Sequence, residues 1–470
     1  MHLENKENKL ALIKSISGIR GTIGGKAGEA LTPEDIVQLT AAYAEWVKKN
    51  SPHKTVIVGR DGRISGEIVK RLVIATLQSS GLNVYDLDLS TTPTVEMAVK
   101  DEEAGGGIII TASHNPRQWN ALKLLNSNGE FLSGDAGKEV LAIAESKNVD
   151  YEKIEGLGTV TRKKDYINKH IEKILALPLV DKEAIAAQNF TIVVDGINST
   201  GGTAVPKLLR ALGVENIYEL YCTPDGKFAH NPEPLPENLS SLSNEVKFRK
   251  ADLGIAVDPD VDRLALVCED GNFFGEEYTL VAVADYVLQH NPGNTVSNLS
   301  STKALKDITE KHKHKHYASA VGEVHVVAKM KEVNAVIGGE GNGGIIYPEI
   351  HYGRDALVGI ALFLTHLAKS KKSCSVLRSH YPNYFISKNK IQLDEEINLD
   401  NVLDKIKAKY KHLPMNTEDG VRIEFENDWV HLRRSNTEPI IRIYSESSNN
   451  TTAEHLAEKI ILDIKAFIKG

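Results

Sequence analysis

An apolar segment of the chain, DLGIAVDPDVDRLALV, carries three aspartates spaced two residues apart. In an extended segment alternate side chains point to the same side, so Asp258, Asp260 and Asp262 can converge. Clustered carboxylates repel one another unless a cation joins them, and a set of oxygen ligands favours a hard ion such as Mg²⁺. The sequence therefore predicts a metal site in this loop.

Two other interpretations of the aspartate loop compete with this one. An EF-hand is the first, because Glu269 falls at the position of its last ligand. Arg263, however, stands where an EF-hand needs glycine, Pro259 interrupts the pattern, and LALV is typical of a strand. A solvated acidic turn is the second, and the apolar strands expected on both sides argue against it.

A second segment, GGGIIITASHNP, is an apolar strand followed by small polar residues. Ser113 comes just after the strand, where nucleophiles and phosphate contacts are often found. His114 is adjacent to Ser113 in the chain and is therefore poorly placed to act as the base of a catalytic triad. From composition alone, a plain turn is an equally good interpretation. Lys123, in WNALKLL, can bring a cation to the same place.

Several loops are rich in arginine and hydroxyl groups. SGIRGT contains Arg20, and VGRDGRISG contains Arg60 and Arg63. Taken singly, each arginine is more often part of a surface ion pair. Because the guanidinium fork matches the oxygens of a phosphate, several such loops in one chain together indicate an anionic ligand. The loop LRRSNTEPIIR adds Arg433, Ser435, Asn436, Thr437 and Arg442.

Glycines surround a carboxylate and an amide in IGGEGNGGIIYP. Glu340 and Asn342 can hydrogen-bond sugar hydroxyls, while glycine allows close approach of the backbone. A structural glycine turn remains the alternative, and the segment is not a P-loop. The tract KHKHKH, with His312, His314 and His316, is interpreted as a solvated basic linker with incidental affinity for nickel.

Composition excludes several classes of protein. The 470 residues are 41% hydrophobic and 25% charged, which is typical of a globular chain of about three domains. The net charge of -7 argues against a bulk nucleic-acid binder. We find no run of about 18 apolar residues that would span a membrane, and no signal-peptide pattern in MHLENKENKL. Three scattered cysteines, Cys222, Cys268 and Cys374, fit a reducing cytoplasm.

Strands and helices alternate along most of the chain, which predicts an α/β fold. The alternation restarts at FTIVVDG and again at EYTLVAVADYVLQ, so three similar units are expected. VRIEF, WVHL and IIRIY then alternate apolar and polar residues, as half-buried antiparallel strands do. We expect domains over residues 1–165, 166–270 and 271–385, and a small α+β domain over 386–470.

In combination, these loops resemble the α-D-phosphohexomutase family of phosphoglucomutases and phosphomannomutases. SGIRGT, TASHNP, DPDVDR, GEGNGG and RRSNTEP occur in the family's order across nearly the whole chain. The resemblance implies three related mixed-sheet α/β domains and a C-terminal α+β domain, similar to the TATA-binding protein, around a central cleft.

The resemblance also implies roles for particular residues. Ser113 would be the phosphorylated serine, with Asp258, Asp260 and Asp262 as ligands of one Mg²⁺ ion that also contacts it. Arg20, Lys123, His114 and Arg263 would lie near the transferring phosphoryl group. Glu340 and Asn342 would read the sugar. The loop that holds the other phosphate would contain Arg433, Ser435, Asn436 and Thr437.

The activity implied is that of an isomerase that moves phosphate between O6 and O1 through a bisphosphorylated sugar. Phosphorylated Ser113 and a glucose 1,6-bisphosphate-type activator would be required. The expected partner is a phosphosugar, without nucleic acid or membrane, in a cytoplasmic monomer or homodimer.

The sugar loop bears on the choice of substrate. Many bacterial members carry Glu-x-Ser-Gly-His, whereas Asn342 and Gly344 replace the serine and the histidine here. His351 or Lys123 could substitute for the missing histidine as an acid or base. The motifs GEGNGG and TEP resemble the corresponding motifs of phosphoglucosamine mutases, so we expect glucosamine 6-phosphate and glucosamine 1-phosphate as substrates. Glucose or mannose phosphates are the alternative.

Two other classes of protein are weighed against a mutase. A non-catalytic sugar-phosphate binder could keep the arginine and glycine loops but lose Ser113 or an aspartate, and all of these are present. A serine phosphohydrolase would have to admit water to phosphorylated Ser113 and would release inorganic phosphate steadily.

Overall fold

The structure is a computed structural model, which describes residues 11–15, 18–392, 399–434 and 440–469. The chain divides into two compact units, each assembled from two stretches of sequence. The first unit comprises Met1–Thr279 and Gly343–Ser375, and the second comprises Leu280–Asn342 and Val376–Gly470.

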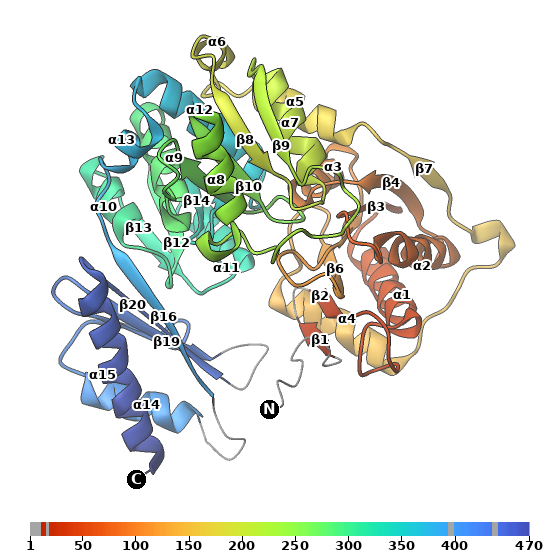
Figure 1. The fold of residues 1–470 in the computed structure, drawn as a ribbon. Helices are drawn as coiled ribbons and strands as arrows, with labels where there is room; N and C mark the ends of the chain where they lie inside the picture. The colour runs from red at the N-terminus through yellow and green to blue at the C-terminus, as the bar shows by residue number, and fades with distance from the viewer. Residues whose placement is uncertain (1–10, 16–17, 393–398, 435–439, 470) are drawn as a thin grey trace, which may run out of the picture. The chain divides into compact units, whose positions relative to one another are not determined.

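The first unit begins with a seven-stranded mixed sheet (Figure 1). Its strands are β1 (Leu12–Ser15), β2 (Gly18–Thr22), β3 (Thr55–Arg60), β4 (Asn83–Leu89), β5 (Gly106–Ile110), β6 (Trp119–Leu125) and β7 (Val160–Arg162). They lie in the order β1-β2-β6-β5-β3-β4-β7. β3 pairs in parallel with β4 and β5, whereas β6 runs antiparallel to β5 and β2.

Helices cover both faces of this sheet. On one face are α1 (Pro33–Asn50), α2 (Gly66–Ser79) and α4 (Gly134–Ser146); on the other are α3 (Thr92–Asp101) and α5 (Tyr166–Leu175). α1 and α2 lie side by side in Figure 1. Because side chains alternate along a strand, Val56 and Val58 of β3 pack in the core of the first face, and Ile57 packs in that of the second. Pro33 is the first residue of α1, a position that suits proline because the N–H it lacks would have no partner within the helix.

A second mixed sheet completes the first unit. Its strands are β8 (Thr191–Asp195), β9 (Asn216–Leu220), β10 (Leu253–Val257) and β11 (Leu264–Cys268), in the order β11-β10-β8-β9. Its helices are α6 (Lys182–Ala186), α7 (Gly201–Ala211), α8 (Ser240–Arg249) and α12 (Ala356–Ser370). α12 is buried from Ala356 to Ala368, as expected for a helix that is apolar on all sides. The aspartate loop connects β10 to its antiparallel neighbour β11.

The second unit contains most of a third sheet, in the order β13-β12-β14-β15. Its strands are β12 (Asn294–Asn298), β13 (His316–Ser319), β14 (Ala335–Glu340) and β15 (Gly344–Ile346). The helices nearby in sequence are α9 (Glu276–His290), α10 (Ala304–Lys311), α11 (Glu323–Glu332) and α13 (Cys374–Arg378). β12 pairs in parallel with β13 and β14, so the α/β pattern expected for this stretch is confirmed.

The fourth sheet is entirely antiparallel, as the alternating pattern of VRIEF, WVHL and IIRIY predicts. Its strands are β16 (Phe385–Gln392), β17 (Met415–Asn416), β18 (Val421–Glu424), β19 (Trp429–Arg434) and β20 (Ile440–Ser447). The order is β16-β20-β19-β18-β17, and α14 (Leu399–Lys409) and α15 (Asn450–Lys469) share a core with it. Three α/β sheets followed by this α+β sheet confirm the expected fold class.

The histidine tract does not form the solvated linker expected from its sequence. His312 lies at the end of α10, and its Nε2 is 2.8 Å from the Asp285 carboxylate. His316 belongs to β13, with its Nδ1 2.9 Å from the Thr295 hydroxyl. Burial, together with Arg422 and Lys306, lowers the pKa of His316 to about 3. The linker interpretation is wrong because two of the three histidines pack into the unit.

Candidate active site

Ser113 and the aspartate loop meet within the first unit. Ser113 follows the parallel strand β5, and Asp258 follows β10, so both stand where a strand ends. The Ser113 hydroxyl donates a hydrogen bond of 2.7 Å to Asp258 Oδ2. The two residues are 145 positions apart in the chain. The fold therefore brings the candidate nucleophile directly to the candidate metal loop.

The backbone of Ser113 has an uncommon conformation. Its φ is +48°, in the left-handed region that few residues other than glycine occupy. The Ser113 N–H donates to the Thr111 hydroxyl at 2.9 Å, and Thr111 in turn donates to Asp61 at 2.7 Å. Such strain is maintained only where the surroundings fix it, and it is typical of functional sites.

Arg63 holds the loop that carries Ser113. Its side chain is fully buried, and its Nε donates to the Asp61 carboxylate at 3.0 Å. The guanidinium also donates to four backbone carbonyls of the loop: Ser113 O and Asn115 O at 2.6 Å, Pro116 O at 2.8 Å and Trp119 O at 2.9 Å. All of these acceptors are on the protein itself.

The expectation that Arg60 and Arg63 contact an anionic ligand is therefore corrected. Arg63 is committed to Asp61 and to the serine loop, as described above. Arg60 donates from Nε to Asp88 at 3.1 Å and lies 3.6 Å from Glu67. The residue types alone indicated a phosphate site, but burial and ion pairing make these arginines structural.

The three aspartates converge as their spacing predicts, and all three are fully buried. Asp258 Oδ1 accepts hydrogen bonds from the backbone N–H groups of Asp262 and Arg263, at 3.1 and 3.2 Å. Val261, between Asp260 and Asp262, has a φ of +64°, which is strained for a β-branched residue. The loop is thus a tight, strained turn rather than a solvated acidic one, and β11 follows it directly.

Cations surround the carboxylates. Lys123 Nζ donates to Asp260 Oδ2 at 2.6 Å, and Arg354 donates to Asp262 Oδ2 at 2.7 Å. Burial, followed by the charges of Asp262 and Asp260, raises the pKa of Asp258 well above its usual value. Burial acts in the same direction on Asp262, but Arg354 and Lys123 outweigh it and hold the pKa of Asp262 below its usual range.

Two carboxylate oxygens in this group fit a metal ion. Among the described residues, Asp260 Oδ1 and Asp262 Oδ1 are buried and accept no hydrogen bond. One ligand oxygen from each of the three aspartates lies within 4.8 Å of the others. Because a buried charged oxygen without a partner is costly, and hard oxygen ligands suit Mg²⁺, the group can hold such an ion.

Three other predicted residues, His114, Arg263 and Arg20, belong to the surroundings of Ser113 and the aspartate loop. The His114 Nδ1 is 3.3 Å from the Ser113 hydroxyl. Burial, with the nearby Arg263 charge, lowers the pKa of His114 well below its usual value, so its imidazole is neutral. Arg263 donates to Glu233 at 3.3 Å. Burial and Arg263 also lower the pKa of Arg20, which shows that these cations share one electrostatic environment.

Two residues that hydrogen-bond to the aspartate loop are not among the predicted site residues. Thr92, in the first turn of α3, donates to Asp260 Oδ2 at 2.5 Å. Ser199 accepts from the Gly62 N–H at 2.9 Å and donates to the Pro259 carbonyl at 2.6 Å. Both lie in motifs, TTPT and DGINSTGG, whose small polar residues were the available signal.

The predicted sugar and phosphate loops belong to the second unit. Glu340 is buried at the end of β14, where its Oε1 accepts from the Asn298 amide at 2.8 Å and the Gly322 N–H at 3.1 Å. Asn342 follows it in the same loop. Arg433 donates to Asp419 at 3.0 Å. Ser435, Asn436 and Thr437 lie outside the described residues.

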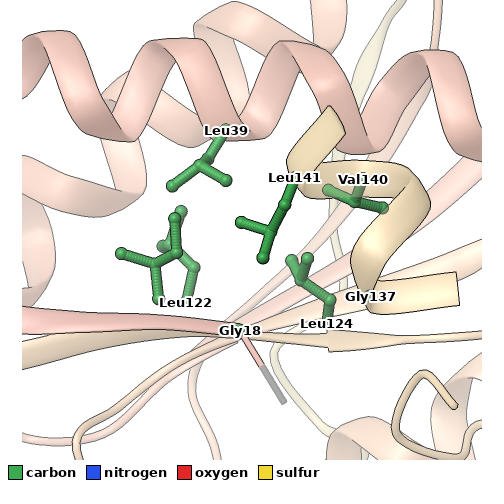
Figure 2. Close-up of a pocket in the computed structure, with 8 residues that line it drawn as sticks. Gly18, Leu39, Leu122, Leu124, Gly137, Val140 and Leu141 are labelled. Atoms are coloured by element: carbon green, nitrogen blue, oxygen red, sulfur yellow. The ribbon is translucent and has the colours of Figure 1, made fainter. Parts of the chain in front are cut away.

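An apolar pocket in the first unit, shown in Figure 2, is not the site for a phosphosugar. It lies against α1, α4 and the large sheet, and glycine and aliphatic residues line it: Gly18, Ile19, Leu39, Leu122, Leu124, Gly137, Val140 and Leu141. Such a lining offers a phosphate neither charge nor hydrogen bonds. We assign it to the packing of α4.

Comparison with known proteins places the chain in a family. Four profiles of phosphoglucomutase/phosphomannomutase match in order: alpha/beta/alpha domain I over residues 12–150, domain II over 165–271, domain III over 275–384 and the C-terminal domain over 390–462. The chain therefore belongs to the phosphoglucomutase/phosphomannomutase family, and its activity is that of a phosphohexomutase.

Individual relatives cover nearly the whole chain. A phosphoglucomutase/phosphomannomutase of Thermococcus kodakarensis is 36% identical over 96% of this chain and 99% of its own. A phosphoglucosamine/phosphogalactosamine mutase of Sulfurisphaera tokodaii is 31% identical over 96% of this chain and 98% of its own. A crystal structure of a family member from Burkholderia thailandensis, 25% identical, covers 97% of both chains with a TM-score of 0.84.

Within the described ranges, each helix is too short or too polar to cross a bilayer.

Chelating divalent cations is expected to abolish mutase turnover, and added Mg²⁺ to restore it. The half-saturating Mg²⁺ concentration should fall as the pH rises, because a proton on Asp258, whose pKa is raised, competes with the ion. Once Asp258 has lost its proton, the dependence should level off. Turnover titrated with Mg²⁺ at a series of pH values measures this. A half-saturating concentration that does not change with pH would contradict it.

Proposed function

We propose that this phosphohexomutase interconverts glucosamine 6-phosphate and glucosamine 1-phosphate. The observation that carries the mutase chemistry is the 2.7 Å hydrogen bond from Ser113 to the aspartate group. The choice of an amino sugar is supported by the GEGNGG loop and by the name of the Sulfurisphaera relative. A carboxylate such as that of Glu340 suits the ammonium group of glucosamine through a charge-assisted hydrogen bond.

In the proposed mechanism, Ser113 Oγ carries the phosphoryl group. The bond from Oγ to phosphorus breaks as the free hydroxyl of the sugar phosphate bonds to phosphorus, which gives a bisphosphorylated sugar. The neutral imidazole of His114 accepts the hydroxyl proton. After the sugar turns over, its other phosphate returns to Ser113 Oγ, and the sugar oxygen regains a proton.

The charges around Ser113 support this transfer. When bound by Asp258, Asp260 and Asp262, Mg²⁺ would supply positive charge to the phosphoryl oxygens. Lys123, Arg20 and Arg263 add fixed cations. The pKa of Lys123 is raised, since Asp260 and Asp262 outweigh its burial, so we assign it electrostatic stabilisation rather than the role of a base.

The remaining roles concern substrate and priming. Glu340 and Asn342 read the sugar, and the loop of Arg433, Ser435, Asn436 and Thr437 holds the phosphate that is not transferred. A glucose 1,6-bisphosphate-type activator phosphorylates Ser113 at the start. We place the enzyme in the cytoplasm as a monomer or homodimer, with domains over 1–165, 166–270, 271–385 and 386–470.

A comparison of kcat/KM on three sugars tests the substrate. One preparation is assayed with glucosamine, glucose and mannose phosphates, with Mg²⁺ and a trace of glucose 1,6-bisphosphate. We expect glucosamine phosphate to be preferred about 100-fold, which is about 2.7 kcal/mol of transition-state binding. Equal or higher kcat/KM on glucose or mannose phosphate would reject the proposed preference for glucosamine phosphate. The Thermococcus relative's name, phosphoglucomutase/phosphomannomutase, supports that second candidate function.

Replacing Glu340 with glutamine is expected to lower kcat/KM on glucosamine phosphate more than on glucose phosphate. The selective loss should be about 10- to 100-fold, the value of one charge-assisted hydrogen bond. Glu332→Gln, on α11 in the same unit, exchanges an exposed carboxylate that pairs with Lys329 and serves as the control. An equal loss on both sugars would argue against amino-group recognition by Glu340.

A further inference from the structure

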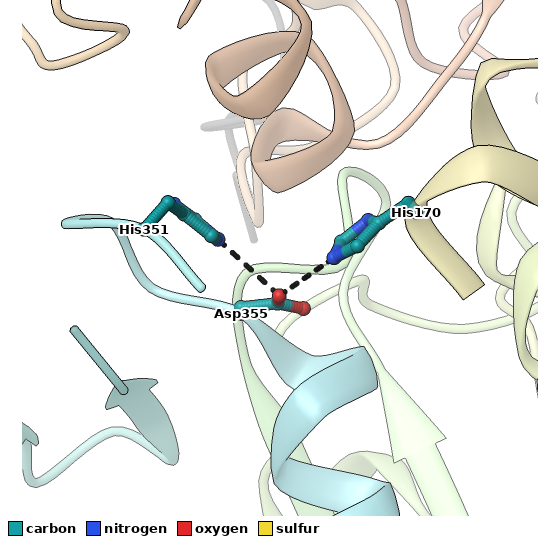
Figure 3. A group of neighbouring side chains, drawn as sticks. All are labelled: His170, His351 and Asp355. Atoms are coloured by element: carbon teal, nitrogen blue, oxygen red, sulfur yellow. Dashed lines mark hydrogen bonds and ion pairs between the residues drawn. The ribbon is translucent and has the colours of Figure 1, made fainter. Parts of the chain in front are cut away.

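A second buried group of polar side chains lies in the first unit, apart from the serine and the aspartate loop. Figure 3 shows two imidazoles, those of His170 on α5 and His351 before α12, directed at the carboxylate of Asp355. Asp355 and His170 are fully buried, and His351 is 7% exposed. The segments that carry them are far apart in sequence, and the mechanism above uses none of the three.

The donor atoms of this group lie close enough together to be ligands of one metal ion. The Nε2 atoms of His170 and His351 lie 2.9 and 3.2 Å from the same oxygen, Asp355 Oδ2. All three atoms are within 4.8 Å of one another. A tetrahedral ion with ligands at about 2.05 Å separates its ligand atoms by about 3.3 Å, so a small outward movement would admit it. Nitrogen and carboxylate ligands suit Zn²⁺.

Each imidazole has an oxygen close to its outer nitrogen, in a hydrogen bond for His170 and at ion-pair distance for His351. The Nδ1 of His170 hydrogen-bonds the Thr94 hydroxyl at 3.0 Å, and the Nδ1 of His351 lies 3.4 Å from Glu96 Oε2. Metal-bound histidines are oriented in this way, with the second nitrogen fixed by an oxygen so that Nε2 presents its lone pair to the metal.

Gly353 makes room for this outer contact. A Cβ atom on Gly353 would lie 1.9 Å from Glu96 Oε2 and 3.0 Å from the His351 ring. Only glycine therefore allows the Glu96 carboxylate to approach His351 at this point.

The group contains two buried carboxylates. Asp355 and Glu96 are both buried, and a divalent ion would offset the charge of these carboxylates. These buried carboxylates would stabilise a cation placed between the imidazoles and Asp355.

We propose that His170, His351 and Asp355 bind one structural Zn²⁺ ion, with a water molecule in the fourth position. The ion would connect α5 to the N-terminus of α12, where Asp355 Oδ1 accepts from the N–H groups of Leu357 and Val358. It would also brace the aspartate loop, because the adjacent Ala356 N–H donates to Val261 O at 3.2 Å.

Metal analysis of the full chain tests this site. The protein is purified without metal-affinity chromatography, because of its histidine tract, from cells supplied with zinc, and is dialysed against a weak chelator. Mass spectrometry of the metals should find about one zinc per chain. The variants His351→Gln and Asp355→Asn should lose about nine-tenths of it. His314→Gln and Asp260→Asn should keep it, which separates this site from the histidine tract and the aspartate group.

A spectroscopic measurement keeps the test decisive if the variants fail to fold. Wild-type protein reloaded with Co²⁺ in place of zinc should show the visible absorption of a tetrahedral ion, and Asp260→Asn should show the same band. Wild-type protein with no stoichiometric zinc and no such band would overturn the proposal. Zinc that disappears with Asp260→Asn instead would also overturn it, because the metal would then belong to the aspartate group.

Discussion

Ser113→Ala is expected to abolish mutase turnover, lowering kcat by about 10⁴-fold or more. Alanine has no oxygen to accept or donate the phosphoryl group, and loss of a covalent nucleophile is among the largest single effects in enzymes. The fold should be retained, because the change removes one hydroxyl and its hydrogen bond to Asp258. A coupled assay of kcat, primed with glucose 1,6-bisphosphate, measures the loss.

A second readout separates the chemistry of Ser113 from a general disturbance. Wild-type protein incubated with the bisphosphate should gain the mass of one phosphoryl group, and the alanine variant should not. Ser146→Ala, an exposed serine on α4, should leave both turnover and the added phosphoryl group unchanged. Near-normal turnover by Ser113→Ala would reject the phosphoserine mechanism, as would a phosphoryl group gained by that variant.

The sequence predicts those parts of the site that depend on the spacing of residues within a single segment. Asp258, Asp260 and Asp262 converge because their spacing of two is the period of an extended chain. The four-sheet architecture follows from the alternation of strands and helices, and the antiparallel C-terminal sheet from its period-two segments.

Other features of the site have no local signal. The contact of Ser113 with Asp258 spans 145 residues, and only the family resemblance placed them together. His170 and Asp355 are 185 residues apart, and no pattern in either segment connects them. Tertiary contacts of this kind depend on how the strands and helices pack, which the spacing of residues within one segment does not encode.

Arginine was the residue type for which the sequence left two interpretations, an ion pair for each residue taken singly and an anionic ligand for the loops taken together. A guanidinium is chemically suited both to a phosphate and to a set of backbone carbonyls, and sequence cannot tell a buried arginine from an exposed one. Arg63 proved to be fully buried and Arg60 to be ion-paired, whereas Arg20 and Arg263 lie among the charges of the site. Whether an arginine is buried decides between binding a phosphate and holding the backbone, and only the folded structure shows which arginines are buried.

Arg63→Met is expected to cause the largest loss of stability among single substitutions in the serine loop. Removing the guanidinium leaves the buried Asp61 carboxylate without its ion-pair partner and four loop carbonyls without their donor. Breaking a buried pair costs about 3–5 kcal/mol, because the remaining charge is uncompensated. At about 2–4 °C per kcal/mol for a unit of this size, Tm should fall by about 10 °C.

Thermal denaturation of the two variants and a double variant identifies the cause of that loss. Arg71→Met, which removes an exposed partner of Glu67, should leave Tm within about 2 °C of wild type. Adding Asp61→Asn to Arg63→Met removes the uncompensated charge and should recover part of the lost Tm. Turnover should remain low in the double variant, because the carbonyls of the serine loop still lack their donor. A Tm of Arg63→Met equal to that of Arg71→Met would show that the serine loop is held by other contacts.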